Sequence, residues 1–200
     1  MPTRGLLIDI DGVLVVSWKA LPGAVEAFDA LRSAGIPMRL LTNTTSRTRS
    51  EITEALREAG FGVEADEVIT VAAATASHLA ERHPDARCLL LNSGDLTADL
   101  TGITLAPPGA DPDAVDVVIL GGAGPEFTWD ALNHALACLT AGASLVALHR
   151  NLLWRTAEGL KLDTGAFLAG LEQAARVEAT IIGKPAPAMF HAAVAALGLP

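Results

Sequence analysis

Two hydrophobic patterns alternate along the whole chain. Short, mainly apolar segments predict strands that are buried on both faces. These segments are Leu6–Ile10, Ile36–Thr42, Val68–Thr70, Cys88–Leu91, Val115–Leu120, Ser144–Leu148 and Thr180–Ile182. Between them, apolar residues recur at helical spacing, which predicts helices near Val25–Leu31, Arg49–Ala59, Ala72–Arg82, Trp129–Thr140, Gly165–Val177 and Met189–Leu197. Strands and helices in alternation predict an α/β protein with parallel sheets.

The overall charge argues against one class of partner. The sequence has 23 Asp and Glu against 14 Lys and Arg, a formal net charge of −9, whereas nucleic-acid binding needs a positive surface. Cys88 and Cys138 lie in apolar segments without metal-ligand spacing, which predicts free, buried thiols and a cytoplasmic location. Acids interrupt the N-terminal apolar run, so no signal peptide is expected, and no segment predicts a membrane span.

The first predicted strand ends in two carboxylates. Asp9 and Asp11 follow the apolar run that begins at Leu6, and alternate residues of a strand point to the same face. Carboxylates at the end of a buried strand are costly unless they meet a cation or have a proton to transfer. Because ligands bind at the carboxyl ends of parallel strands, the pair predicts an enzyme that uses a metal.

A second polar cluster follows the strand that ends at Thr42. The run Thr42-Asn43-Thr44-Thr45-Ser46 offers hydroxyl and amide groups, and the next helix offers backbone N–H groups that can bind a phosphate. Ser and Thr are also preferred N-cap residues, so the same run could serve only to begin the helix. Beside the two carboxylates of the first strand, phosphate binding is the better interpretation.

A lysine stands directly after the strand that ends at Ile182. Lys184 lies between Gly183 and Pro185, two residues that restrict where the chain can go. An exposed lysine at a helix start is the simplest interpretation. In combination with the two polar clusters, we expect Lys184 to neutralise a phosphate or to hold a carboxylate nucleophile in position.

The three motifs together resemble those of a known superfamily. The segments Asp9-Ile10-Asp11-Gly12-Val13, Thr42-Asn43 and Lys184-Pro185, in this order, resemble the first, second and third motifs of the haloacid dehalogenase (HAD) phosphotransferases. The resemblance covers essentially the whole chain and is strongest to the branch with a large α/β cap. Within that branch, Leu21–Ala24 and Gly159–Gly165 are similar to the phospholysine phosphohistidine inorganic pyrophosphate phosphatase family.

The resemblance implies a fold with an inserted domain. A HAD-like Rossmannoid core with a parallel sheet would consist of residues 1–72 and 180–200, and an α/β cap of residues 73–179 would be inserted between them. The superfamily also has a fourth motif, an acidic strand end that supplies a further metal ligand. The chain stops at Pro200 without such an acid, so we expect a core that is truncated at the C-terminus or a site that another chain completes.

The same resemblance implies a role for each motif residue. Asp9 would be the nucleophile that forms an aspartyl-phosphate, and Asp11 would protonate the leaving group and then activate water. Mg²⁺ would be the cofactor, held by Asp9 and by the backbone carbonyl of Asp11. The residues implied to bind the phosphate are Gly12, Thr42, Asn43 and Lys184.

Candidate substrate contacts in the implied cap follow the strand that ends at Leu148. These basic and amide side chains could bind the part of a substrate remote from the phosphate or could form an exposed loop, and they are His149, Arg150, Asn151 and Arg155. Trp154 is predicted to pack rather than to bind a ligand. The glycine-rich segment 121–124 lacks the spacing of a dinucleotide fingerprint, so no such cofactor is expected.

Two functions of different kinds stay open. The first is a Mg²⁺-dependent phosphatase that hydrolyses a small phosphorylated metabolite, a phospho-amino acid or pyrophosphate. The second is a weakly active or inactive protein of the same fold that binds a phospho-ligand or a partner. The motif residues favour the first, and the missing acid favours the second. A small phosphorylated substrate is the expected partner, and pairing into a homodimer is left open.

Overall fold

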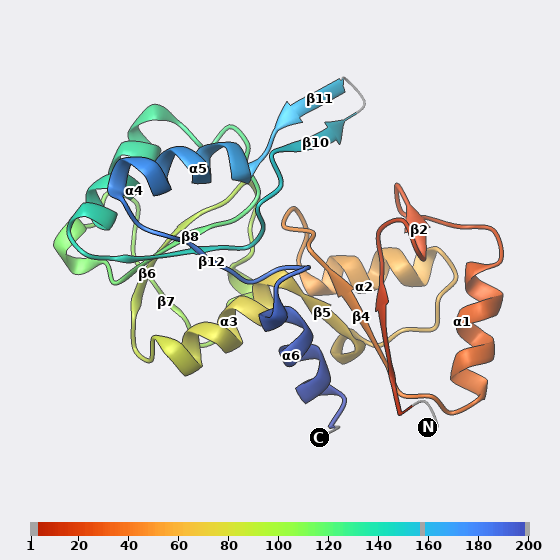
Figure 1. Cartoon of the computed structure of the whole chain (residues 1–200). Helices are drawn as coiled ribbons and strands as arrows, with labels where there is room; N and C mark the ends of the chain where they lie inside the picture. Colours follow the sequence, from red (N-terminus) through yellow and green to blue (C-terminus); the bar gives the residue numbers. More distant parts are fainter. Residues whose placement is uncertain (1–3, 157–158, 199–200) are drawn as a thin grey trace.

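The strands form two main parallel sheets with helices on their faces (Figure 1). The computed structural model describes residues 4–156 and 159–198. The first sheet contains, in order, β1 (Leu6–Asp9), β4 (Met38–Thr42) and β5 (Val68–Thr70). The second sheet contains, in order, β12 (Thr180–Ile181), β9 (Ser144–Ala147), β8 (Val117–Leu120), β6 (Arg87–Leu91) and β7 (Thr104–Leu105). The predicted α/β class is confirmed.

Alternate residues of the first sheet enter two different hydrophobic clusters. Leu40 of β4 packs with helices α1 (Ala24–Ser33) and α2 (Arg49–Glu58) on one face. The next residue, Leu41, belongs to the cluster on the opposite face. Because side chains of a strand alternate between faces, a strand that is covered on both sides must be apolar throughout. This explains why apolar residues stand at neighbouring positions, Leu40 and Leu41, before the polar segment at Thr42.

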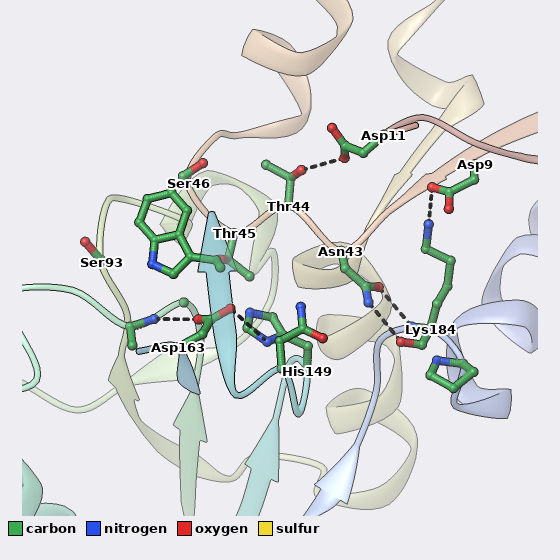
Figure 2. Close-up of a pocket in the computed structure, with 15 residues that line it drawn as sticks. Asp9, Asp11, Asn43, Thr44, Thr45, Ser46, Ser93, His149, Asp163 and Lys184 are labelled. Atoms are coloured by element: carbon green, nitrogen blue, oxygen red, sulfur yellow. Dashed lines mark hydrogen bonds and ion pairs between the residues drawn. The ribbon is translucent and has the colours of Figure 1, made fainter. Parts of the chain in front are cut away.

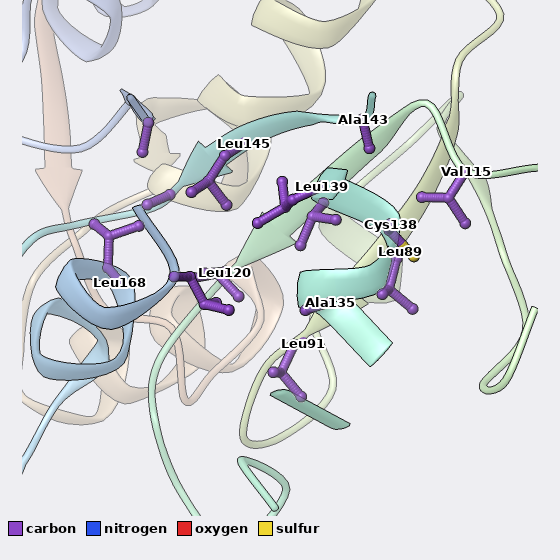
Figure 3. Packing of buried hydrophobic residues seen from close by; sticks show 14 of the residues in the cluster. Leu89, Leu91, Val115, Leu120, Ala135, Cys138, Leu139, Ala143, Leu145 and Leu168 are labelled. Carbon is purple, nitrogen blue, oxygen red and sulfur yellow. The ribbon is translucent and has the colours of Figure 1, made fainter. Parts of the chain in front are cut away.

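One face of the second sheet carries the helices α4 (Trp129–Thr140) and α5 (Thr164–Ala175). Figure 3 shows Leu120 of β8, Cys138 of α4 and Leu168 of α5 in this layer, and all three residues are fully buried. Cys88 and Cys138 are free and buried, as predicted. Burial raises the pKa of the Cys88 thiol to about 11, so this thiol is not a reactive nucleophile near neutral pH.

The helices α3 (Val71–Arg82) and α6 (Pro187–Ala196) form a layer that both sheets share. They pack against Val117 on the other face of β8 and against Leu41 of the first sheet in one hydrophobic cluster. This shared layer fixes how the ends of the two sheets face each other. In the described part of the chain, no helix has the length and apolar character needed to cross a membrane.

The predicted boundary between cap and core falls at residue 180 and stays a prediction. Strand β12 begins there, and it pairs in parallel with β9 of the second sheet, Thr180 opposite Val146. The following helix α6 instead contacts the first sheet, because the Arg39 guanidinium of β4 donates a 2.6 Å hydrogen bond to the carbonyl of Ala196. The C-terminal segment therefore connects the two sheets.

A first hairpin has no signal in the hydrophobic pattern. Strands β2 (Val15–Val16) and β3 (Lys19–Ala20) pair in an antiparallel manner, and both have only two residues. The turn between them places Ser17 and Trp18 at φ values of 50° and 60°. Non-glycine residues adopt this left-handed conformation only rarely, so turn propensity does not predict it.

A second hairpin projects from the body of the molecule (Figure 1). It consists of β10 (Leu153–Thr156) and β11 (Gly159–Leu162), and it pairs with neither main sheet. Leu153 and Trp154 of β10 are exposed, and no residue of β11 is buried, so burial does not give this hairpin the apolar pattern of the other strands.

The described part of the chain also contains three short 3₁₀ segments, namely η1 (Ala65–Glu67), η2 (Thr97–Asp99) and η3 (Pro112–Ala114).

A buried carboxylate connects the second sheet's loops to the first sheet. Asp99 in η2 accepts hydrogen bonds from the backbone N–H of Arg49 at the start of α2, at 2.8 Å, and from the hydroxyl of Thr70 at the end of β5, at 3.0 Å. The Asp99 residue is 8% exposed. Its removal would leave two donors without a partner, and a buried donor without a partner is destabilising.

We expect Asp99→Ala to lower the free energy of unfolding by about 2–4 kcal/mol, from the loss of two charge-assisted hydrogen bonds. Urea denaturation followed by circular dichroism measures this change. Asp113→Ala is the matched control, because Asp113 is exposed in η3, and its effect should stay within about 0.5 kcal/mol. Equal effects of the two substitutions would contradict a structural role for the Asp99 contacts.

Candidate functional site

A cleft of about 600 Å³ lies at the carboxyl ends of both main sheets (Figure 2). Parallel sheets place ligand sites at this end of their strands. Its lining comes from segments that follow β1, β4, β6, β8, β9 and β12, and from the hairpin. The lining residues are Asp9, Asp11, Asn43, Thr44, Thr45, Ser46, Ser93, Gly122, Ala123, His149, Asn151, Trp154, Asp163, Lys184 and Pro185.

An ion pair joins the first strand to the segment after the last strand. Lys184 Nζ donates to Asp9 Oδ1, and it also donates to the carbonyl of Leu41 at 3.2 Å. The Lys184 side chain is 19% exposed, whereas that of Asp9 is 43% exposed. The lysine is therefore partly enclosed, and the carboxylate stays open to the cleft.

Two hydroxyl groups lie within hydrogen-bond distance of Asp11, the carboxylate that follows β1. The hydroxyls of Thr42 and Thr44 lie 3.0 and 3.1 Å from Asp11 Oδ2. Thr42 is fully buried and holds the loop, since its Oγ1 also accepts the backbone N–H of Thr44 at 2.9 Å. Gly12 has a φ of +82°, which favours glycine, and its N–H donates to the carbonyl of Val15 at 2.8 Å.

Asn43 fixes the backbone of Lys184. Asn43 Oδ1 accepts the backbone N–H of Lys184, and Asn43 Nδ2 donates to its carbonyl, both at 2.9 Å. Gly183 allows this close approach, because a Cβ at this position would overlap the Leu148 carbonyl and lie 2.7 Å from Asn43 Oδ1. The contacts with Lys184 use both ends of the Asn43 amide, so Asn43 acts as a positioning residue for the lysine in this structure.

A different carboxylate stands on the opposite side of the cleft (Figure 2). Asp163 is the N-cap of α5, and its Oδ1 accepts the backbone N–H groups of Thr164, at 2.8 Å, and Ala123, at 3.4 Å. Its Oδ2 lies 3.9 Å from Nδ1 of His149. This distance is too long for a hydrogen bond, and Nδ1 is buried without a hydrogen-bond partner.

A buried amide holds the two sides of the cleft together. Asn92 Oδ1 accepts the N–H of Gly122 at 2.7 Å, and Asn92 Nδ2 donates to the carbonyl of Thr45 at 3.3 Å. A Cβ on Gly122 would overlap the Thr45 hydroxyl, so only glycine lets the loops approach this closely. The loop after β4 and the loop after β8 are therefore fixed relative to each other.

The structure brings together most of the residues that the motifs indicated. Asp9, Asp11, Asn43 and Lys184 line the cleft, and Thr42 lies behind them against Asp11. Gly12 belongs to the same loop but is not a lining residue. Thr44, Thr45 and Ser46 also line the cleft, and they belong to the polar run for which phosphate binding is predicted. The lining residues for which the sequence predicts no binding role are Ser93, Gly122, Ala123, Trp154 and Asp163.

Only some of the candidate substrate contacts of the implied cap line the cleft. His149 and Asn151 line the cleft. Arg150 points away from it, because its guanidinium forms two hydrogen bonds with Glu172 of α5, at 2.8 and 2.7 Å. The backbone of Arg155 lies in β10, and its side chain is outside the described part of the structure. Trp154, which was predicted to pack rather than to bind a ligand, is 48% exposed and lines the cleft.

The donor set of the first strand fits a hard divalent cation. Asp9 and Asp11 supply carboxylate and carbonyl oxygens, the ligands that Mg²⁺ prefers. Within residues 4–156 and 159–198, no group of three or more His, Cys, Asp or Glu side chains could hold a metal. A cation at Asp9 would therefore need backbone, water or phosphate oxygens to complete its shell, which is the usual arrangement for Mg²⁺.

Comparison with known sequences identifies relatives along most of the chain. A family model described as haloacid dehalogenase-like hydrolase matches residues 6–105. Haloacid dehalogenase-like hydrolase domain-containing protein 2 from Homo sapiens is 33% identical over 195 residues, which cover 98% of this chain and 72% of the relative. Phospholysine phosphohistidine inorganic pyrophosphate phosphatase from Xenopus laevis is 30% identical over 202 residues, with the same two coverages.

Solved structures of phosphatases have the same fold. A p-nitrophenyl phosphatase from Archaeoglobus fulgidus superposes with a TM-score of 0.88 at 25% identity, over 98% of this chain and 75% of that protein. A glycerol phosphate phosphatase from Mycobacterium tuberculosis in complex with calcium superposes with a TM-score of 0.83 at 31% identity, over 96% of this chain and 56% of that protein. These matches confirm the resemblance that the motifs indicate.

The burial of His149 predicts a specific pH dependence of stability. Burial lowers the pKa of His149 below its ordinary value, and the Asp163 carboxylate opposes only part of this shift. The unfolded state thus binds the proton at a higher pH than the folded state. The contribution of neutral His149 is fully present above about pH 6.5, and it is lost as the pH falls below that value toward the folded-state pKa.

We expect the free energy of unfolding to fall more steeply between about pH 7 and pH 5 in the wild-type chain than in His149→Gln, since only the wild type must protonate this ring on unfolding. Urea denaturation across this range measures the two slopes. His191→Gln is the control, because His191 is exposed on α6, and it should keep the wild-type slope. An unchanged slope in His149→Gln would show that His149 does not titrate as its burial requires.

Proposed function

The chain belongs to the haloacid dehalogenase-like hydrolase family, and we propose that it hydrolyses a small phosphorylated compound with Asp9 as the nucleophile and Mg²⁺ as the cofactor. The observation that carries this proposal is the pairing of Asp9 with Lys184 at the open end of β1. A carboxylate nucleophile must be accessible and held in place. The enclosed lysine holds Asp9, whose side chain stays 43% exposed at the cleft.

The reaction would proceed in two steps. In the first, a carboxylate oxygen of Asp9 attacks phosphorus, the bond to the leaving oxygen breaks, and Asp11 gives that oxygen a proton. In the second, Asp11 takes a proton from a water molecule that attacks the aspartyl-phosphate, which releases phosphate and regenerates Asp9. The hydrogen bonds from Thr42 and Thr44 to Oδ2 orient Asp11 and leave its other oxygen available to carry the proton.

Several side chains would stabilise the charge that develops on the phosphoryl oxygens. Lys184 offers an ammonium group beside Asp9, and Thr44 and Thr45 line the cleft after β4. Asn43 would contribute by holding the Lys184 backbone in place. Fixed donors of this kind favour the transition state because they need not reorganise during the reaction.

A bound Mg²⁺ would neutralise phosphate charge at the cleft. The residues that would hold it are Asp9, through its carboxylate, and Asp11, through its backbone carbonyl. The solved structure with calcium named above is a relative that binds a divalent cation. Lys184 would then share Asp9 with the cation and keep the carboxylate oriented toward phosphorus.

The identity of the substrate is proposed only as a class. The relatives are named for phospholysine, phosphohistidine, pyrophosphate, p-nitrophenyl phosphate and glycerol phosphate. We extend to this chain only their common feature, a small phosphorylated compound such as a metabolite, a phospho-amino acid or pyrophosphate. A cytoplasmic location and pairing into a homodimer remain proposals from the sequence.

The direct test of the nucleophile is hydrolysis of p-nitrophenyl phosphate. We expect Asp9→Asn to reduce kcat by at least about 10³-fold, because the amide is a poor nucleophile and covalent catalysis is lost. Asp130→Asn is the matched control, since Asp130 is exposed on α4, and it should keep the wild-type rate. Retention of activity in Asp9→Asn would contradict the assignment of Asp9.

Removal of the metal is a separate test. We expect the activity of the wild-type chain to disappear after dialysis against EDTA and to return on addition of Mg²⁺, because phosphate and Asp9 repel each other without a cation. The folded state should persist during this treatment, as measured by circular dichroism. Full activity in the presence of EDTA would contradict the assignment of Mg²⁺ as cofactor.

A further inference from the structure

The wall of the cleft opposite Asp9 contains two buried polar residues that the reaction above does not use. Asp163 and His149 are 6% and 4% exposed, and both line the cleft. Figure 2 shows them across the cleft from Asp9 and Asp11. A substrate whose phosphoryl group contacts Asp9 would extend its leaving group toward this wall.

Asp163 presents one oxygen that no backbone donor uses. Its hydrogen bonds to the N–H groups of Thr164 and Ala123 are made by Oδ1. These bonds fix Oδ1 at the N-terminus of α5, where Asp163 is the N-cap residue. Oδ2 lies 3.9 Å from His149 Nδ1, beyond hydrogen-bond distance. This oxygen is therefore able to accept a further hydrogen bond.

His149 contributes a second acceptor. Its Nδ1 is enclosed without a hydrogen-bond partner and faces the carboxylate. A carboxylate beside one ring nitrogen favours the proton on that nitrogen, which leaves Nε2 as the acceptor of the neutral imidazole. Gly165 lets the loop that follows His149 lie close to the start of α5, because a Cβ on Gly165 would overlap the carbonyl of Arg150. The wall thus combines an anion with a neutral acceptor.

Acidic side chains outnumber basic ones around the cleft. Its described lining contains three carboxylates, those of Asp9, Asp11 and Asp163, and one ammonium group, that of Lys184. Arg150, which could have offset Asp163, is bound to Glu172 instead. Trp154 adds an aromatic side chain, whose face attracts cations. Within the described lining, Asp163 has no cationic side chain beside it, so a leaving group with a negative charge would be repelled there.

We propose that Asp163 and His149 form a specificity site for a hydrogen-bond donor on the leaving group, so that the preferred substrates are phosphomonoesters whose leaving group carries an ammonium or a hydroxyl group and not a carboxylate. This inference rests on the proposed function, because it assumes that the phosphoryl group lies at Asp9. The expected order of affinity is protonated amine first, hydroxyl second and carboxylate last. An ammonium gains the attraction of Asp163, whereas a hydroxyl gains only the hydrogen bond.

The test compares three phosphates of nearly equal size. Calorimetric titration of the Asp9→Asn chain with Mg²⁺ present would measure the Kd of 2-aminoethyl phosphate, 2-hydroxyethyl phosphate and phosphoglycolate without turnover. We expect the amine to bind at least about tenfold more tightly than phosphoglycolate, the effect of one charge-assisted hydrogen bond. Comparison of the amine with the alcohol separates recognition of a positive charge from recognition of a hydrogen-bond donor.

Asp163→Asn, added to Asp9→Asn, should bring the ratio of the amine and phosphoglycolate constants close to one. Asparagine is also a good N-cap and keeps the oxygen that accepts from Thr164, so the helix should form. His149→Met is the second variant, because it fills the buried volume without a ring nitrogen, and it should lower the preference for the amine and the hydroxyl. Asp130→Asn changes the net charge equally and should keep the wild-type ratio.

Two kinds of failure are distinguishable. If phosphoglycolate binds as well as the amine, if Asp163→Asn leaves the ratio unchanged, or if none of the three phosphates binds, the inference is overturned. If the ratios change as expected but the wild-type chain does not hydrolyse p-nitrophenyl phosphate, the specificity site stands as a binding site and the proposed hydrolysis is overturned.

Discussion

The ion pair between Asp9 and Lys184 is the contact on which the site depends. It joins the first strand of one sheet to the segment that follows the last strand of the other. Neither residue could reach the other unless the shared layer of α3 and α6 held the ends of both sheets face to face. The reciprocal hydrogen bonds between Asn43 and the Lys184 backbone then fix the lysine. A preorganised charge pair of this kind costs little reorganisation when phosphate binds.

The two walls of the cleft differ in chemistry. The loops after β1 and β4 bring carboxylates and hydroxyls that suit a cation and a phosphate, and the segments after β9 and β11 bring His149 and Asp163 to the opposite wall. Asn92 and Gly122 hold the walls at a fixed distance, since the amide bridges the two loops and glycine allows their close contact. In the proposed function, one wall would carry the reaction and the other would select the substrate.

The sequence predicts the parts of the fold in which burial decides the structure. Strand β5 and helix α4 have the bounds expected from the hydrophobic pattern, because β5 is buried at all three positions and α4 buries one face. The hydrophobic pattern does not predict the hairpin of β10 and β11, because Leu153 and Trp154 are exposed and β11 has no buried residue. The motif residues Asp9, Asp11, Asn43 and Lys184 were found from their positions at strand ends, whereas Asp163 precedes a helix, where an acid is usually only an N-cap. Only the tertiary fold shows that this N-cap residue, Asp163, also lines the cleft.

The most direct measurement of the central claim is covalent trapping of the phosphoryl group. Asp11→Asn should still let Asp9 attack p-nitrophenyl phosphate, because p-nitrophenolate is a good leaving group, but it should slow the attack of water that needs a base. We predict that acid quenching and mass spectrometry will find one phosphoryl group on the peptide that contains Asp9. A phosphoryl group on another residue, or none while the wild-type chain turns over the same substrate, would contradict nucleophilic catalysis by Asp9.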